Sequence, residues 1–224
     1  MKRKLYRLTV ILIFFETLIS CTAQPHNNNR HSTERNQIFD TVIKKDIPLD
    51  KKGSPRSYYR NKKAVEEKLG IATLENGFDS LQIRIWYGYA FNDSSQLIIL
   101  KNVTGKWSGE LFSLIYMMNQ EGDSIESINK VIVNGEPKSG WKYLIEKIIN
   151  LNILTLPDYH TLSDYNQTAD GDAVIIEVST KNVYRIYSYQ EPHMFQDKHW
   201  QAKNMEQILG LIEEEFNFKR LRKL

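Results

Sequence analysis

The sequence predicts an α+β domain, an antiparallel sheet with helices packed against it. Two observations lead to this fold class. β-type segments follow one another with short turns between them, and short connections make consecutive strands antiparallel. Helix-type segments stand before, between and after these blocks of strands. We expect a meander of about four strands, a two-stranded hairpin, and three helices packed on one face of the sheet.

The first helix is expected to begin at Ser54-Pro55. Serine is a common N-cap residue, and proline suits the first helical position. The helix should end at Leu69, because the following Gly70 can adopt the left-handed conformation of a C-terminal cap.

The strands are recognised by apolar residues at every second position. From Leu81 to Phe91 this alternation holds over eleven residues. The other expected strands are shorter or less regular and span residues 96–103, 107–118, 128–133, 173–179 and 183–189.

Two later helices show an apolar stripe at helical spacing. The first follows Ser139 as its N-cap, and the last begins near Asp197, also read as an N-cap, with Trp200 on its buried side. Acidic runs on the helices, Glu66-Glu67 and Glu213-Glu214-Glu215, are expected to be solvated.

The charge distribution argues against nucleic-acid binding. The net charge is +3, but four of the 30 basic and one of the 27 acidic side chains lie within residues 1–20. The remainder is formally neutral, whereas binding to phosphates needs a clustered basic excess. Only Lys219, Arg220, Arg222 and Lys223 are locally basic. We interpret them as a solvated helix end, with an anionic lipid or partner as the alternative.

The first twenty residues have the form of an export signal. Met1–Arg7 is basic, and the apolar run Leu8–Phe15 is too short to span a bilayer. Leu18-Ile19-Ser20-Cys21 then resembles the lipobox of bacterial lipoproteins, although Glu16 stands where an uncharged residue is usual. The resemblance implies cleavage before Cys21, acylation of its thiol, and a protein anchored in the inner or outer membrane of the cell envelope. The following Thr22-Ala23-Gln24 lacks the acidic cluster associated with surface display in some lipoprotein families, which favours the periplasmic face. The alternative is an uncleaved membrane anchor.

We therefore expect three parts: a signal peptide (1–20), a disordered tether (21–52) and one globular domain (53–224). Residues 38–43 are interpreted either as a short docked segment or as partly ordered linker. Since Cys21 is the only cysteine, the domain has neither an internal disulfide nor a thiol nucleophile.

Two stretches are compared with metal sites. Residues 164–172 hold four oxygen-bearing Asp and Asn side chains. However, Ala169 and Ile175 occupy the EF-hand positions of the glycine and the bidentate glutamate, so a turn is favoured. His193, Asp197 and His199 could bind zinc, but the six-residue spacing of the histidines does not suit one helix face. We expect no metal and no cofactor.

The favoured binding surface lies at the end of the last strand. Tyrosine combines apolar area with a polar tip, which suits an exposed binding face. The residues assigned to this surface are Tyr187, Tyr189, Glu191, His193 and His199. The alternative is that the tyrosines merely cover the sheet edge.

No catalytic motif stands out. There is no G-x-S-x-G elbow and no glycine-rich phosphate loop. We expect a membrane-tethered, non-enzymatic domain that binds an envelope protein or a ligand. One alternative is a small hydrolase assembled in space from Asp164, Asp170, Asp172, His193 and His199; another is an immunity-type lipoprotein.

Overall fold

The computed structural model describes residues 43–88, 94–121, 124–166 and 171–220. The signal segment, Cys21 and most of the predicted tether lie outside these residues. So do the predicted strand end at Phe91 and the candidate ligand Asp170.

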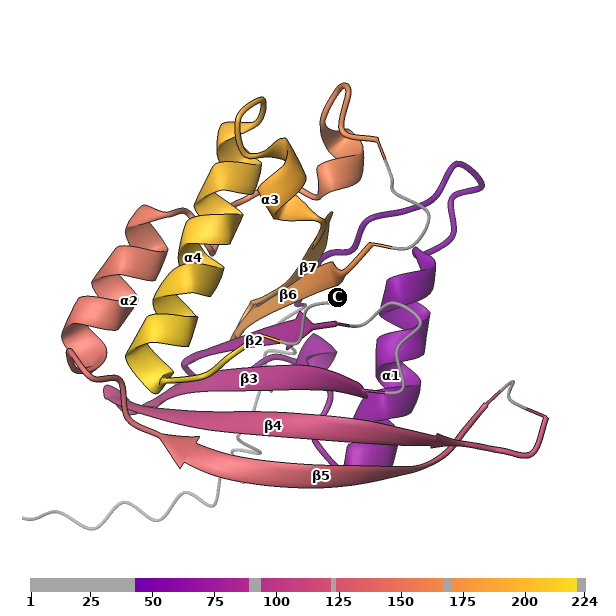
Figure 1. Cartoon of the computed structure of the whole chain (residues 1–224), viewed down its shortest axis with the longest axis horizontal. Helices are drawn as coiled ribbons and strands as arrows, with labels where there is room; N and C mark the ends of the chain where they lie inside the picture. The colour runs from indigo at the N-terminus through magenta and orange to yellow at the C-terminus, as the bar shows by residue number, and fades with distance from the viewer. Residues whose placement is uncertain (1–42, 89–93, 122–123, 167–170, 221–224) are drawn as a thin grey trace, which may run out of the picture. The chain divides into compact units, whose positions relative to one another are not determined.

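The described residues form an α+β fold, which confirms the predicted class (Figure 1). One mixed sheet has the strand order β1-β7-β6-β2-β3-β4-β5. The strands are β1 Lys44–Asp46, β2 Leu81–Tyr87, β3 Ser94–Val103, β4 Lys106–Met118, β5 Ile125–Gly135, β6 Ala173–Thr180 and β7 Val183–Gln190. The helices are α1 Ser57–Leu69, α2 Trp141–Asn150, α3 Pro192–Phe195 and α4 Trp200–Phe216.

The finer predicted arrangement is not matched. β6 and β7 do not form a separate hairpin, because β6 pairs along its length with β2 and so joins the larger sheet. β1 adds a parallel strand beside β7 that the sequence pattern did not reveal. Residues 44–46 had been assigned to the tether, so the folded region begins earlier than the predicted boundary at residue 53.

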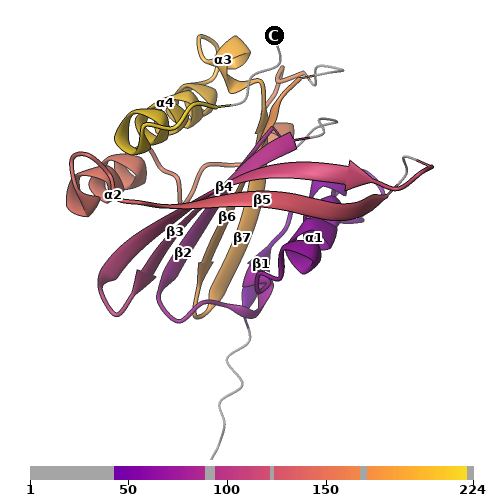
Figure 2. The same cartoon turned by 60° about the horizontal axis from the view of Figure 1, so that its bottom comes forward.

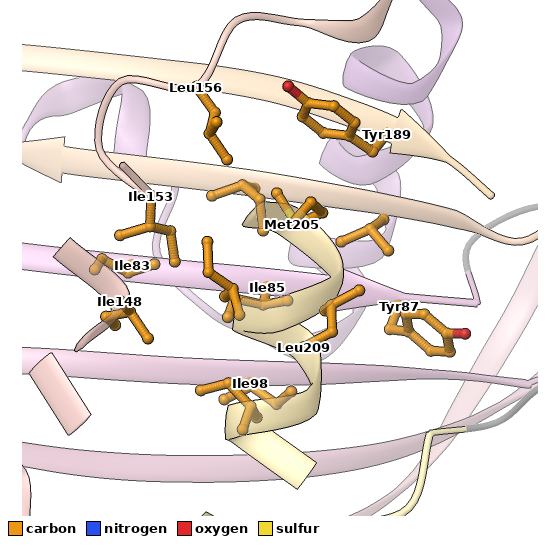
Figure 3. Packing of buried hydrophobic residues seen from close by; sticks show 14 of the residues in the cluster. Ile83, Ile85, Tyr87, Ile98, Ile148, Ile153, Leu156, Tyr189, Met205 and Leu209 are labelled. Atoms are coloured by element: carbon orange, nitrogen blue, oxygen red, sulfur yellow. The ribbon is translucent and has the colours of Figure 1, made fainter. Parts of the chain in front are cut away.

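Helices cover both faces of the sheet, not one (Figure 2). Alternate residues of each central strand belong to two different cores. On one face Ile83 and Ile85 pack beneath α2 and α4, with Met205 and Leu209 of α4 above them (Figure 3). On the other face Trp86 packs with Tyr59 and Val65 of α1 and other buried residues. A sheet covered on both faces explains why its central strands are almost entirely buried.

The helix ends differ from the expected caps. Gly70 does close α1 in the left-handed region (φ +67°), but α1 begins at Ser57, after Arg56. Pro55 instead forms a bridge with Leu49. At the other end of the chain, α3 was not predicted, and His199, not Asp197, precedes α4. Trp200 is exposed, so its assignment to the core was wrong.

Two acidic side chains predicted to be solvated are buried. Glu66 joins an ionic network beneath α1. Glu215 accepts a hydrogen bond from the backbone N–H of Ser139 at 2.7 Å, which ties α4 to the segment before α2. Helical position alone could not distinguish these carboxylates from their exposed neighbours.

Candidate functional site

A pocket of about 260 Å³ lies where the ends of β2 and β7 meet α4 and the C-terminal segment. Its lining combines charged, aromatic and apolar side chains and comes from five separate parts of the chain: Tyr87, Asp172, Glu191, Pro192, His193, Met194, Glu206 and Arg220. It is the best candidate for a site, since concave surfaces with convergent polar groups are where small ligands and peptides bind.

Glu191 is the central acidic group of this pocket. Its backbone lies in the left-handed region (φ +46°, ψ 55°), which costs a residue other than glycine roughly 1 kcal/mol. Two hydrogen bonds with Asp172 hold it there: the Glu191 N–H donates to the Asp172 carbonyl oxygen at 2.9 Å, and the Asp172 N–H donates to Glu191 Oε1. Glu191 Oε2 then lies 3.2 Å from Nδ1 of His193. The turn after β7 therefore fixes a carboxylate beside an exposed imidazole.

Arg220 closes the opposite side of the pocket. Its guanidinium pairs with Glu206 and Glu213, with N–O distances of 2.8 Å to each, and its carbon lies 5.6 Å from the centroid of the Tyr87 ring. Burial acts to lower the pKa of Arg220, but Glu206 and Glu213 outweigh it and raise the pKa above its ordinary value. The prediction of a solvated basic tail is thus wrong for Arg220, because α4 ends at Phe216 and the chain folds back.

The predicted tyrosine surface is not exposed. Tyr187 and Tyr189 retain 1% and 0% of their accessible area, and Figure 3 shows Tyr189 within the core. Their hydroxyls donate to the backbone carbonyls of Ile153 and Pro157. The strand ends in tyrosines because buried aromatic rings with a satisfied hydroxyl fill the space beneath the loop 151–158.

The other predicted residues divide into two groups. Glu191 and His193 line the pocket, whereas His199 packs against Phe195 and Tyr165, 5.3 Å from the latter ring. Of the hydrolase candidates, Asp172 and His193 share the pocket, and Asp164 instead occupies a left-handed turn (φ +61°) outside its lining. No group of three His, Cys, Asp or Glu side chains suited to a metal ion occurs among the described residues.

A buried carboxylate that the sequence analysis missed is Asp158. Its Oδ2 accepts hydrogen bonds from Tyr58 Oη (2.8 Å) and from the N–H (2.9 Å) and Oγ of Ser188. Its Oδ1 lies 2.8 Å from Nδ1 of His160 and accepts the His160 N–H. Burial acts to raise the pKa of Asp158, but these hydrogen bonds prevail and lower it. Because Ser188 bonds to the carboxylate and not to the imidazole, the cluster is not a nucleophilic triad; it joins α1, β7 and the loop before β6.

A second missed cluster lies beneath α1. Lys62 Nζ contacts Glu66 (2.8 Å) and Glu177 (2.9 Å), and Arg84 contacts the other oxygen of Glu66. Glu177 also accepts hydrogen bonds from Trp86 Nε1 and Tyr184 Oη. The charges of two cations and two carboxylates thus neutralise one another in a buried position. This arrangement holds α1 to the sheet. Polar residues inside predicted strands, Arg84 and Glu177, were the available sequence signal.

Comparisons with known proteins identify no relative. No family model matches the chain, and searches of the curated proteins and of the solved structures return no significant match. Within the described part of the chain, none of the helices combines the length and the hydropathy needed to cross a membrane.

Proposed function

We propose that this chain is an envelope lipoprotein held at a membrane by acyl chains on Cys21, and that its folded domain binds a partner or ligand through the pocket at Glu191. The anchor is supported by the signal-like residues 1–20 and the lipobox-like Leu18–Cys21. Two or more acyl chains hold a protein on a bilayer far more firmly than one does.

The observation that carries the binding role is the strained, doubly hydrogen-bonded backbone of Glu191 at the pocket. Strained backbone conformations of this kind are common at ligand sites, where contacts with the surrounding structure hold the residue in place. Next to it, Met194 is 60% exposed, so an apolar contact area adjoins the fixed carboxylate and imidazole. An apolar side chain beside charged groups suits a protein or peptide ligand that carries a cationic group.

The test is affinity capture of the acylated protein from membranes with a matched pair of variants. Met194→Lys places a positive charge at the pocket, which repels a cationic group, while Trp200→Lys places the same charge on a side chain that is 56% exposed and not part of the lining. We expect one stoichiometric partner with the native chain and with Trp200→Lys, and its loss with Met194→Lys. Equal capture of the partner by both variants would show that the binding site lies elsewhere on the domain.

A second candidate function is hydrolysis, which the shared position of Asp172 and His193 in one pocket favours. Carboxylate and imidazole are the usual general acids and bases of water-dependent cleavage. The readout is release of soluble products from isolated cell envelopes. Release that disappears in His193→Gln but persists in His160→Gln would favour the enzyme over the binding domain.

A further inference from the structure

The outer edge of β5 is a long strand edge that no other described strand pairs with. β5 is eleven residues long and is a terminal strand of the sheet, and within the described residues no strand pairs with its free side (Figure 1). An edge strand presents a row of backbone N–H and C=O groups that another strand can pair with.

The two edges of this sheet are built differently. β1 is three residues long, consists of Lys44, Lys45 and Asp46, and is exposed throughout, which is how natural edges avoid pairing. β5 contains no proline, and its single lysine, Lys130, donates to the carbonyl oxygen of Leu69 at 3.0 Å. Apart from Glu126 and a register shift with β4 near its start, the β5 edge lacks the devices that protect β1.

The centre of β5 is also apolar on both sides. Val131, Ile132 and Val133 are 64%, 47% and 57% exposed. Val131 and Val133 lie on the same face as α2 and α4, opposite Ser113 and Leu111 of β4. In Figure 2 these helices cover only one part of that face, and the ends of β4 and β5 extend beyond them.

The uncovered area continues onto β4. Ile115 and Met117 share the face of Val131 and are about half exposed, but they lie one strand in from the edge, opposite Asn129 and Ser127 of β5. At the edge itself the apolar side chains on this face are Val131 and Val133. A partner must therefore supply a strand for the backbone and apolar side chains for these two valines. Another copy of β5 supplies both at once.

We propose that two copies of this chain associate through β5, paired antiparallel about a two-fold axis at Ile132, so that their sheets become one continuous sheet. A two-fold interface uses the same surface on both copies, and each copy then satisfies the other's edge. This inference rests on neither the lipid anchor nor the Glu191 pocket.

Side-chain chemistry selects the register. With the axis at Ile132, Val131 of one copy faces Val133 of the other, and Lys130 faces Asn134. Moving the axis to Val131 sets Lys130 opposite Ile132, and moving it to Lys130 sets two ammonium groups opposite each other. Directly opposed like charges destabilise antiparallel pairs, whereas β-branched pairs stabilise them.

The first test is the mass of the full chain in detergent, measured by sedimentation velocity over a range of concentrations. We expect the native chain to change from monomer to dimer as its concentration rises. Val131→Lys together with Val133→Lys should remain a single copy wherever the native chain is paired. The control is Val103→Lys at the end of β3, which is 51% exposed and should pair as the native chain does.

The second test reads the register by oxidative cross-linking. Ile132→Cys brings two thiols opposite each other at the axis, within the range that a disulfide spans. Asn129→Cys is equally accessible on β5, but its two copies would lie about 20 Å apart. Cys21, the only native cysteine, is common to both variants.

We expect a covalent dimer from Ile132→Cys and background cross-linking from Asn129→Cys. A native chain of single-copy mass at every concentration would overturn the proposal. Dimerisation that persists in the Val131→Lys, Val133→Lys double variant would do the same, as would equal cross-linking by the two cysteine variants. Either result would show that the contact between the copies lies elsewhere.

Discussion

Gly109 of β4 lies directly opposite Gly135 of β5, and both positions make room for aromatic rings from the helices above. A Cβ at Gly109 would lie 2.9 Å from Cη2 of Trp141. One at Gly135 would lie 2.7 Å from both Phe216 Cδ1 and Leu111 Cδ1. The missing side chains therefore let the rings of α2 and α4 pack close to the backbone of the sheet.

We predict that Gly135→Ala lowers the free energy of unfolding by about 1–3 kcal/mol, the usual cost of overpacking a core. Gly109→Ala should act in the same direction, because the Gly135 carbonyl oxygen is only 3.1 Å from the new methyl group. Urea denaturation measures both. Gly210→Ala in α4, where the Cβ meets open space, is the control and should stabilise by up to about 1 kcal/mol. Unchanged stability in both strand variants would contradict this account of the packing.

The ionic network under α1 predicts that substitutions at two adjacent lysines, Lys62 and Lys63, lower the free energy of unfolding by very different amounts. Lys62→Met leaves Glu66 and Glu177 buried beside only one cation, Arg84, and should cost about 3–5 kcal/mol. Lys63→Met removes the contact of a half-exposed side chain with Glu75 and should cost at most about 1 kcal/mol. Chemical denaturation of the two variants side by side gives the comparison. Similar losses would show that the buried network contributes no more than a surface pair.

Asp158 predicts a pH-dependent contribution to stability. Its pKa is lowered in the folded state, so its stabilisation is complete above the unfolded-state value of about 3.9 and is lost as the pH falls through the folded-state value. Asp158→Asn should therefore cost about 1.5–3 kcal/mol at pH 7, because its hydrogen bonds to a charged group are lost.

The measurement for Asp158 is the unfolding free energy of the variant and the native chain between pH 7 and pH 3. We expect the difference to narrow as the pH falls below about 4. The exposed Asp79→Asn should stay within about 0.5 kcal/mol of the native chain at pH 7. A gap for Asp158→Asn that widened toward acid would mean that the carboxylate is not stabilised in its ionised form.

The lipid anchor predicts the outcome of a single substitution. Cys21→Ala should abolish incorporation of labelled fatty acid and leave a longer, unprocessed chain, since the thiol is the proposed site of acylation. Thr22→Ala, one residue further on, should be labelled and processed normally. The readouts are radiolabelling and intact-protein mass. Labelling that persisted without Cys21 would remove the basis for an envelope location.

Part of the candidate site was accessible to sequence reasoning. Glu191 and His193 could be named because polar residues clustered after the last strand, where a chain leaving a sheet often forms a site. Arg220 and Tyr87 could not, because they lie far from residue 191 in the sequence. β2 brings Tyr87 to the pocket, and the chain must turn back after α4 to bring Arg220 there. Tyr187 and Tyr189 were predicted to be exposed but are buried, since periodicity shows which residues share a face of a strand but not what covers that face.

Local patterns by themselves determined the α+β class, the existence of the main strands and helices, and the end of α1 at Gly70. These features depend on period, turn residues and backbone preferences within a few positions of the chain. The tertiary structure decided that both faces of the sheet are covered, that Lys62 meets Glu177 and that β1 joins β7. It also decided that none of the described strands pairs with the outer side of β5. Each depends on which segments distant in sequence pack together, and burial and pairing of that kind leave no periodic signal in either segment alone.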